Sequence, residues 1–486
     1  MGALVAALSK RGDDVVPLVT AMLQELIHRG AQSHEVITPN ATILAESLEE
    51  LRNRCSISSS VSIGLNVSSH DTKALPHPKH SGAVFEGRIF HNSANSSPTQ
   101  ITSDKSLLPE EMAKTLLRNF DGSYALAFAS TGRMLIGRDP LGTMPLYYGE
   151  DDELCVVALE RKALWKIGIH DASSFPPGNL AIVNPEGFSF KSVWTIPHEP
   201  PRRIKMHNAV MHLKSLLEES TRERLRGAKK VGIAFSGGLD SSLIAHLAQK
   251  AGVTVRLVSV GLEGQPELSH ASEAARALGL PIILQEYSIG DVEKTLPKVL
   301  WLVEEPDVMK AGVAIPLFWS AQLASKLHCT VLLAGQGADE LFGGYHRYLT
   351  IYQKKGVEKV AESLFQDTVM SYETNFQRDE PLYAYHKVEL RLPFVDTSVV
   401  RFALSLPVDL KIESADDCLR KRILRQLAEG LGIPAFIAKR PKKAIQFATG
   451  VDKALRDLAK SKGLTLREYV EEVFKRVHVQ SGRDPS

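Results

Sequence analysis

Short β-type runs separated by turn residues dominate the chain up to residue 196. Two helices, 15–29 and 109–119, are expected to interrupt these runs. Strand-rich segments broken by a few helices are typical of a β-rich α+β domain, which is the fold class expected for this half. The expected strands are Ser60–Val67, Ala83–Phe90, Ser123–Ala129, Met134–Ile136, Leu154–Ala158 and Leu180–Val183.

Beyond residue 204 the pattern changes to wholly apolar strands that alternate with helices. Strands that are apolar throughout are buried on both faces, which predicts an α/β domain with a parallel sheet covered by helices. From residue 357 onward the chain is expected to be mostly helical. The expected strands are Val231–Phe235, Thr254–Val260, Pro281–Tyr287 and Thr330–Ala334, and the expected helices are Leu239–Ala251, Glu267–Leu278, Val292–Val303 and Ala314–Lys326.

The segment Ile196–Arg203 separates the two patterns and holds three prolines within five residues. Prolines at this density block helices and sheet ladders, so the segment is expected to be a linker. The chain has 486 residues. This exceeds the roughly 250–300 residues at which a single core stops growing. We therefore predict two domains, residues 1–196 and 204–486.

The composition excludes several classes of protein. Hydrophobic residues make up 44% and charged residues 23%, which excludes a wholly disordered, collagen-like or coiled-coil chain. The net charge of +2 gives no reason to expect a nucleic-acid partner. The four cysteines form no CxxC pair, which argues against a disulfide scaffold or a zinc site. Neither a membrane span nor a signal peptide is recognisable, so we expect a cytoplasmic protein.

The stretch SGGLDSS at 236–242 carries the clearest chemistry. It lies between an expected strand and an expected helix, where glycines allow a sharp turn and free N–H groups bind anions. A carboxylate beside a phosphate needs a cation between them, and Mg²⁺ bound to Asp240 would supply it. The alternative is an ordinary strand–helix turn in which serine and aspartate cap the helix. The candidate phosphate-binding residues are Ser236, Gly237, Gly238, Asp240, Ser241 and Ser242.

A second glycine-rich stretch, 335–344, follows the expected strand Thr330–Ala334. Carboxyl ends of parallel strands line one edge of a sheet, where ligands bind. Both glycine loops should therefore open onto the same edge, which makes Asp339 a second candidate Mg²⁺ ligand. A helix-capping aspartate in a glycine-rich turn is the structural alternative.

These segments resemble the synthetase domain of the asparagine synthetase family. The match also includes Glu304–Asp307, Val388–Asp396, Leu419–Arg425 and Arg440–Gln446. The first half resembles the family's class II glutamine amidotransferase domain, a β-sandwich with flanking helices, most closely at Arg138–Tyr148. The resemblance implies an ATP-dependent ligase that adenylates a carboxylate, releases pyrophosphate and aminates the acyl group with release of AMP. Aspartate is the expected acid and asparagine the product.

The resemblance also assigns roles to single residues. It places Phe235, Val260, Ala334 and Gly335 at the nucleotide. Lys421 matches a lysine that stabilises transition-state charge, a task that suits an ammonium group. Without the resemblance, Lys421 would be interpreted as an ordinary cation on a basic helix.

Position 336 departs from the family, which often has glutamate where this chain has Gln336. Glutamine cannot act as a general base. Glu389 is a candidate replacement, because related amide-forming enzymes use a carboxylate in that region. Its alternative role is a salt bridge to Arg391 or Arg425. The departure leaves the identity of the acid open.

The first domain lacks the family's nucleophile, a cysteine directly after the initial methionine. The chain begins Met-Gly-Ala-Leu, and its first cysteine is Cys55. Glu86 stands where the family has an oxyanion-binding asparagine, and the loss of such a donor costs about 10²–10³ in rate. An altered N-terminal sequence is a competing explanation for the missing cysteine. The expected remnants of the glutamine pocket are Arg29, Gly87 and Asp104.

We therefore expect no glutaminase activity, with nitrogen supplied by free ammonia or by a separate glutaminase. Two alternatives remain: the same chemistry on another carboxylic acid, and a non-catalytic regulator that binds nucleotide and amino acid. ATP and Mg²⁺ are the expected cofactors and small molecules the expected partners. A homodimer is suggested only by analogy with other class II domains.

Overall fold

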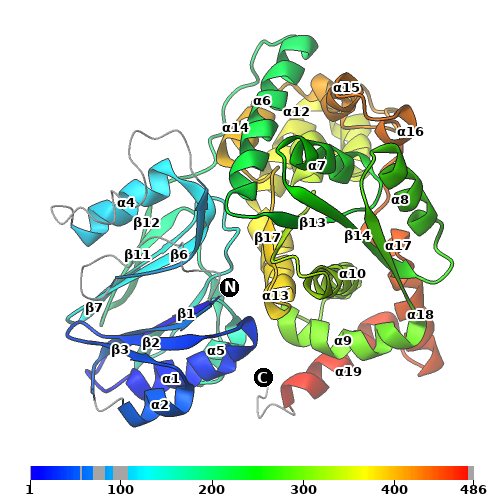
Figure 1. The fold of residues 1–486 in the computed structure, drawn as a ribbon. Coiled ribbons are helices and arrows are strands. Elements are labelled where there is room, and N and C mark those ends of the chain that lie inside the picture. The colour runs from blue at the N-terminus through cyan, green and yellow to red at the C-terminus, as the bar shows by residue number, and fades with distance from the viewer. Residues whose placement is uncertain (1, 55–56, 69–82, 91–107, 480–486) are drawn as a thin grey trace. The chain divides into compact units, whose positions relative to one another are not determined.

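The computed structural model describes residues 2–54, 57–68, 83–90 and 108–479. Contacts divide the chain into two compact units, with the change from the first to the second between Thr195 and Ile196. Figure 1 shows antiparallel sheets in the first unit, and a sheet enclosed by helices in the second.

Two antiparallel sheets form the first unit in the described part of the chain. The seven-stranded sheet has the order β10-β8-β9-β1-β4-β2-β3, and the five-stranded sheet has the order β12-β11-β7-β6-β5. Their strands are β1 (Ala3–Ser9), β2 (Ser33–Ile37), β3 (Thr42–Ala45), β4 (Val61–Val67), β5 (Ala83–Phe90), β6 (Asp121–Ser130), β7 (Arg133–Arg138), β8 (Tyr147–Glu150), β9 (Leu154–Ala158), β10 (Ser173–Ser174), β11 (Asn179–Asn184) and β12 (Gly187–Ser192).

The N-terminal apolar run is an internal strand of this sandwich. One face of β1, with Leu4, Ala6 and Leu8, joins the core between the two sheets. The other face, with Val5 among its residues, packs beneath a helical layer. Both faces of the strand are buried, which explains why the run is apolar at successive positions and lacks the alternation of a half-exposed strand.

Helices cover the outer faces of both sheets. Leu23, Leu51 and Leu164, from three helices, share the core beneath the seven-stranded sheet, while Leu116 packs against the five-stranded sheet. The first of these helices is shorter than the sequence predicts, because a 3₁₀ turn forms its last three residues. The helices are α1 (Val16–Glu25), η1 (Ile27–Arg29), α2 (Leu48–Arg54), α4 (Pro109–Asn119) and α5 (Arg161–Trp165).

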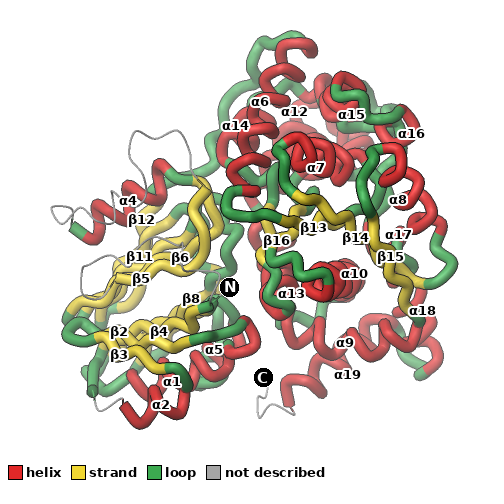
Figure 2. The backbone as a smooth tube through the Cα atoms, viewed as in Figure 1, coloured by secondary structure: helices red, strands yellow, loops and turns green. Residues whose placement is uncertain are grey.

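The second unit is built on a five-stranded parallel sheet with the order β15-β14-β13-β16-β17. Helices lie on both faces of this sheet, with α7 on one side and α10 on the other (Figure 2). The strand at one edge, β17, is not among the strands that the sequence predicts. The strands are β13 (Lys230–Ala234), β14 (Thr254–Leu262), β15 (Ile282–Tyr287), β16 (Val331–Leu333) and β17 (Glu389–Arg391).

Most of the remaining chain is helical, as expected for the part beyond the sheet. One long helix, α12, is kinked at Gly356, where φ is +81°. The helical segments are α6 (Met206–Leu225), α7 (Leu239–Lys250), α8 (Pro266–Ala277), α9 (Ile289–Val303), α10 (Val308–Lys326), α11 (Ala338–Phe342), α12 (Arg347–Val369), η2 (Tyr372–Phe376), α13 (Gln377–Tyr385), α14 (Thr397–Leu404), η3 (Val408–Leu410), α15 (Arg422–Gly430), α16 (Ala435–Ala438), α17 (Ile445–Ala448), α18 (Val451–Ser461) and α19 (Leu466–Val479).

The proline-rich segment Ile196–Arg203 packs within the second unit and is not an isolated linker. The Arg202 amide donates to the carbonyl of Ser405 at 2.8 Å, and the His198 ring meets the Phe365 ring with centroids 4.4 Å apart. In the described ranges, no helix is long and apolar enough to cross a membrane.

Candidate active site

The first glycine loop joins β13 to α7 at the carboxyl edge of the parallel sheet. Phe235 is buried at the end of the strand, and α7 begins at Leu239. At Gly237 φ is +68°, and a Cβ there would lie 2.9 Å from the His270 ring and 3.0 Å from the backbone of Ala271. The turn therefore needs glycine for both its conformation and its close contacts.

Hydroxyl groups hold this loop in shape. The Gly238 amide donates to Ser236 Oγ at 3.3 Å, and Ser241 Oγ donates to the Gly238 carbonyl at 3.3 Å. Ser242 Oγ is buried and has no hydrogen-bond partner in the described part of the chain. The loop thus presents backbone N–H groups and hydroxyls at the start of a twelve-residue helix, the arrangement that binds phosphate.

The second glycine loop lies against the first. It follows β16, which pairs in parallel with β13. A Cβ on Gly335 would come within 3.0 Å of Asp240 Cβ, so only glycine lets the two loops approach this closely. Gly337, with φ of +89°, then turns the chain into α11, which carries Asp339.

Lys421 connects both loops. Its buried ammonium lies 2.6 Å from Asp240 Oδ2 and 2.6 Å from Asp339 Oδ1. Lys442 adds a second cation, 2.7 Å from Asp339 Oδ2. The tertiary structure therefore gathers two carboxylates and two ammonium groups from distant segments into one cluster.

The charges in this cluster favour the ionised state of Asp339. Burial opposes ionisation of this carboxyl, but Lys421 and then Lys442 outweigh burial and hold the pKa of Asp339 below its usual value. The Lys442 side chain is 34% exposed, so partial desolvation lowers its pKa only in part, and the charge of Asp339 outweighs this and raises that pKa. Both partners are therefore charged at neutral pH.

The carboxylates fit a magnesium ion. Mg²⁺ prefers oxygen ligands and keeps several waters, so one or two carboxylates together with substrate phosphates suffice. Asp240 Oδ1 is buried and has no hydrogen-bond partner among the described side chains, so it can accept a cation. Among the described residues no group of three or more His, Cys, Asp or Glu side chains could hold a metal, so any ion here would depend on the two aspartates and a phosphate ligand.

Two residues at the start of α15 have backbone conformations that are uncommon outside glycine. Arg420 and Lys421 both have φ of +52°, a region that costs a non-glycine residue of order 1–3 kcal/mol. Arg425 counteracts this cost, since its Nε donates to the Arg420 carbonyl at 2.6 Å, and the Arg420 amide donates to Asp417 at 2.8 Å. The strained backbone directs Lys421 toward the two aspartates.

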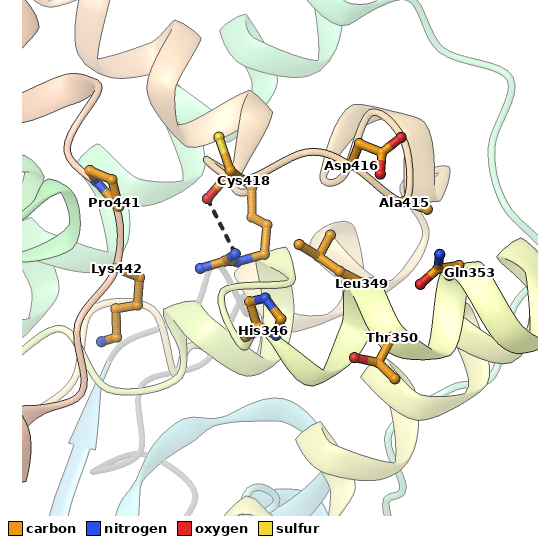
Figure 3. Close-up of a pocket in the computed structure, with 10 residues that line it drawn as sticks. His346, Leu349, Thr350, Gln353, Ala415, Asp416, Cys418, Pro441 and Lys442 are labelled. Carbon is orange, nitrogen blue, oxygen red and sulfur yellow. Dashed lines mark hydrogen bonds between the residues drawn. The ribbon is translucent and has the colours of Figure 1, made fainter.

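A pocket of 480 Å³ adjoins the cluster, between α12 and the loop before Lys421 (Figure 3). Lys442 lines one end, and Asp416 and Gln353 line the other, while Arg420 is also among the lining residues. Arg420 is fixed there, because its Nη1 donates to the Cys418 carbonyl at 3.2 Å and its Nε to the Gly344 carbonyl at 3.0 Å. The cationic end, which Lys442 shares with the cluster, suits an anionic group.

The two other candidate catalytic residues have partners of their own. Gln336 Nε2 donates to Asp379 Oδ2 at 3.2 Å. Glu389 lies in β17 and accepts two hydrogen bonds from Arg391, at 2.8 and 2.7 Å. This bidentate pair is the alternative role expected for Glu389, and it occupies both carboxylate oxygens. The geometry therefore favours a structural role for Glu389.

In the first unit, the predicted remnants of a glutamine pocket are engaged internally. Arg29 is fully buried, with Nε donating to the Gly2 carbonyl at 2.9 Å and Nη1 to Glu160 at 2.9 Å. Burial opposes ionisation of Glu160, but His28 and the neighbouring cations outweigh it and hold the pKa of Glu160 well below its usual value. Arg29 therefore fits a structural ion pair better than a site for a free carboxylate.

Position 2 has no room for a side chain. The Gly2 amide donates to Glu86 Oε1 at 2.9 Å. A Cβ on Gly2 would lie 2.1 Å from the Asn66 carbonyl oxygen and 2.8 Å from Glu86 Oε2. Gly87, whose φ is +112°, follows Glu86 in β5, while Asp104 and Cys55 lie outside the described residues.

Two family models match the chain. The model described as asparagine synthase matches residues 212–359 and 350–483, and the model of a glutamine amidotransferase domain matches residues 83–166. A protein described as a putative glutamine-hydrolysing asparagine synthetase from Methanocaldococcus jannaschii is 32% identical over 416 residues, which cover 76% of each chain. The chain belongs to the asparagine synthetase family. It is a carbon–nitrogen ligase of this ATP-using family.

Other relatives match a smaller share of this chain. Asparagine synthetase 1 of Bacillus subtilis, also described as glutamine-hydrolysing, is 31% identical over 285 residues, which are 52% of this chain and 44% of that relative. Among solved structures, glutamine phosphoribosylpyrophosphate amidotransferase from B. subtilis with ADP and GMP covers 58% of this chain and 80% of its own, at 15% identity and a TM-score of 0.33. That likeness is too weak to define the fold.

Sequence reasoning missed two residues of this asparagine synthetase-family site, Lys442 and Asp379. Lys442 lies inside the basic segment 440–446, but no spacing rule connects it to Asp339. Asp379 comes from a helix whose sequence gives no sign of a ligand. Arg425 lies in the family-like segment 419–425, but its contact with the Arg420 carbonyl was not predicted. Their roles depend on which backbone segments meet in space, and a single sequence does not encode that in any local pattern.

Proposed function

We propose that this protein makes asparagine from aspartate and ammonia while cleaving ATP to AMP and pyrophosphate. The observation that supports the proposal most strongly is the position of Lys421 between Asp240 and Asp339, where two phosphate-type glycine loops meet. A cation that touches both loops lies where a nucleotide phosphate and an acid would react.

The reaction has two steps. A carboxylate oxygen of aspartate attacks the α-phosphorus of ATP, the bond from this phosphorus to the oxygen bridging to the β-phosphate breaks, and pyrophosphate leaves. Ammonia then attacks the acyl carbon, the bond from this carbon to the AMP oxygen breaks, and AMP and one proton leave. In both steps negative charge develops near Lys421. The ammonium group of Lys421 stabilises this charge electrostatically.

The loops supply the rest of the nucleotide site. The start of α7, with Gly237 and Gly238, would bind phosphate oxygens through backbone N–H groups. Further donors would be the hydroxyl groups of Ser236, Ser241 and Ser242. The nucleoside would contact Phe235, Val260, Ala334 and Gly335. Asp240 and Asp339 would hold Mg²⁺, which neutralises phosphate charge when bound.

A screen of acids tests this proposal directly. Pyrophosphate release from ATP is measured with each amino acid in turn, with ammonia or glutamine as nitrogen source. Release with aspartate and ammonia, with asparagine as product, is the expected result. Release only with another acid would favour the second candidate, which the neutral Gln336 keeps open. If no acid gives release, the protein is not this ligase and a binding role would replace the proposal.

We expect Asp240→Asn to raise the Mg²⁺ concentration needed for half-maximal pyrophosphate release by about tenfold or more, because the site loses a charged oxygen ligand. Chelation of Mg²⁺ should abolish release in the parent protein. Asp452→Asn is the matched control, since Asp452 forms a surface ion pair with Arg456. Equal Mg²⁺ titrations for all three proteins would remove Asp240 from the metal site.

We expect the protein to release no glutamate from glutamine at a rate comparable to amide synthesis. Glu86 lies against Gly2, and an ionised carboxylate there would repel a developing oxyanion. Introducing the missing thiol with Gly2→Cys should not restore activity, because a Cβ at that position collides with the Asn66 carbonyl. Glutamate release by the parent at the synthetase rate would contradict this expectation. Without glutaminase activity in this chain, free ammonia or a separate glutaminase would supply the nitrogen.

A further inference from the structure

Arg420 is a buried cation that forms no ion pair with a carboxylate in the described part of the chain. The residue is only 5% exposed. Its Nε donates to the Gly344 carbonyl at 3.0 Å, and its Nη1 donates to the Cys418 carbonyl at 3.2 Å, the bond drawn dashed in Figure 3. A guanidinium group does not lose its proton in proteins, so it cannot avoid the cost of a buried charge by becoming neutral. The charge of Arg420 therefore lacks a counterion.

This state is unusual among the buried arginines of the described ranges. Each of the others either pairs with a carboxylate or donates from all three guanidinium nitrogens. The paired residues are Arg29, Arg224, Arg378 and Arg391, and the fully bonded ones are Arg138 and Arg425.

The third nitrogen of Arg420 is available to a ligand. Nη2 has no hydrogen-bond partner among the described residues, and it is not one of the sealed polar atoms that lack a partner. Arg420 also lines the pocket of 480 Å³ beside α12. The N–H groups of Nη2 are therefore the donors that this residue can present there.

Other lining residues complete a set of donors for an anion. The ammonium group of Lys442 contacts Asp339 at 2.7 Å through one carboxylate oxygen and can donate further hydrogen bonds. Thr350 and Gln353, both from α12, add a hydroxyl and an amide. Asp416 also lines the pocket, but it is exposed and forms no ion pair with Arg420 in the described part of the chain. Two cations with a hydroxyl and an amide suit a doubly charged, tetrahedral oxyanion.

We propose that Arg420 and Lys442 bind a phosphate group in this pocket. The group has two possible sources, which are free phosphate and the pyrophosphate that the reaction releases. Free phosphate would bind whatever the reaction is, whereas the pyrophosphate source rests on the proposed ligase function. Because Lys442 touches both the pocket and Asp339, pyrophosphate could pass along it out of the charged cluster.

Titration of the full chain with inorganic phosphate, followed by calorimetry, tests the role of Arg420. We expect Arg420→Gln to weaken phosphate binding by about tenfold or more, the effect of losing a hydrogen bond to a charged group. Arg422→Gln is the matched control, because Arg422 lies two residues away and pairs with Glu413 at the surface. Equal dissociation constants for the two variants, or no binding by the parent, would overturn the proposal. Arg420→Asn replaces the glutamine variant if thermal unfolding shows that the latter does not fold, since asparagine tolerates a positive φ.

A second pair of variants locates the phosphate without altering the backbone around Arg420. Thr350 is exposed on α12 and lines the same pocket. Thr350→Glu would add a carboxylate that competes with phosphate, whereas Thr350→Gln adds a neutral side chain of the same size. We expect phosphate to bind Thr350→Glu more weakly than Thr350→Gln. Phosphate held at the glycine loop before α7 would instead bind both variants equally, and this result would overturn the proposal.

Pyrophosphate distinguishes the two sources. If the pocket takes the reaction product, pyrophosphate should bind the parent more tightly than phosphate does, and its inhibition of AMP formation should be weaker in Arg420→Gln than in Arg422→Gln. If the pocket takes free phosphate, inhibition by pyrophosphate should be the same in both variants. A parent protein that forms no AMP with any acid would mean that the proposed function has failed. The phosphate titrations need no turnover, so they test the site in that case as well.

Discussion

A Lys421→Gln variant is expected to lose about 10²–10³-fold in the rate of pyrophosphate release, the cost of removing one electrostatic stabiliser from a water-poor site. The buried ammonium contacts Asp240 and Asp339, each at 2.6 Å, so the change also leaves two carboxylates facing each other. Breaking a buried ion pair costs about 3–5 kcal/mol of stability when the remaining charge is uncompensated. Lys442 still compensates Asp339, so we expect the lower end of that range.

The two effects of this substitution are measured separately. Pyrophosphate release is assayed at saturating ATP, Mg²⁺, acid and ammonia, and stability is followed by thermal unfolding. Lys462→Gln is the matched control, because Lys462 forms an exposed pair with Glu293 and should change neither quantity appreciably. A Lys421→Gln protein that stays folded and keeps more than about a tenth of the parental rate would remove Lys421 from the reaction centre.

Gly344→Ala is expected to reduce the rate of pyrophosphate release by about 10²-fold, although it changes no charged group. A loss of this size is typical when one catalytic contact is removed. A Cβ at this position would lie 1.9 Å from Asp339 Oδ1 and 2.4 Å from Lys421 Cε. Neither side chain can move without breaking the ion pair between them. Forcing one extra carbon into such a packed site also costs about 1–3 kcal/mol of stability.

Gly430→Ala is the control for this change. Gly430 ends α15 and is exposed, and a Cβ added there would have no atom within 4 Å. Alanine there should leave the rate unchanged and stability equal or slightly higher, by about 0.4–1 kcal/mol. The assay for both variants is the rate of pyrophosphate release beside a thermal melt. Parental activity in Gly344→Ala would mean that the charged cluster around Lys421 can accommodate an added methyl group.

The centre of the parallel sheet could be predicted from sequence because β13 and β16 are almost entirely apolar, a pattern that burial on both faces imposes. The strand β14 and the helix α7 therefore agree with the predicted ranges to within two residues at each end. β17 does not appear in the prediction, because Glu389–Arg391 is short and largely charged, and only pairing with β16 makes it a strand. β1 is missed as well, since an apolar run at a chain end carries no sign of the sheets and helices that cover it.

The sequence by itself determined the two glycine loops, since glycine suits a positive φ, as at Gly237, and a close approach to a neighbouring side chain, as at Gly335 beside Asp240 Cβ. It also placed both loops at one sheet edge, because strands with apolar residues on both faces form parallel sheets. Only the tertiary structure decided that Lys421 lies beside Asp240, and that Gln336 donates a hydrogen bond to Asp379. These contacts join residues 181 and 43 positions apart, and they depend on how helices pack onto the sheet. Packing of that kind is a property of the whole chain, whereas local patterns report only the immediate neighbours of each residue.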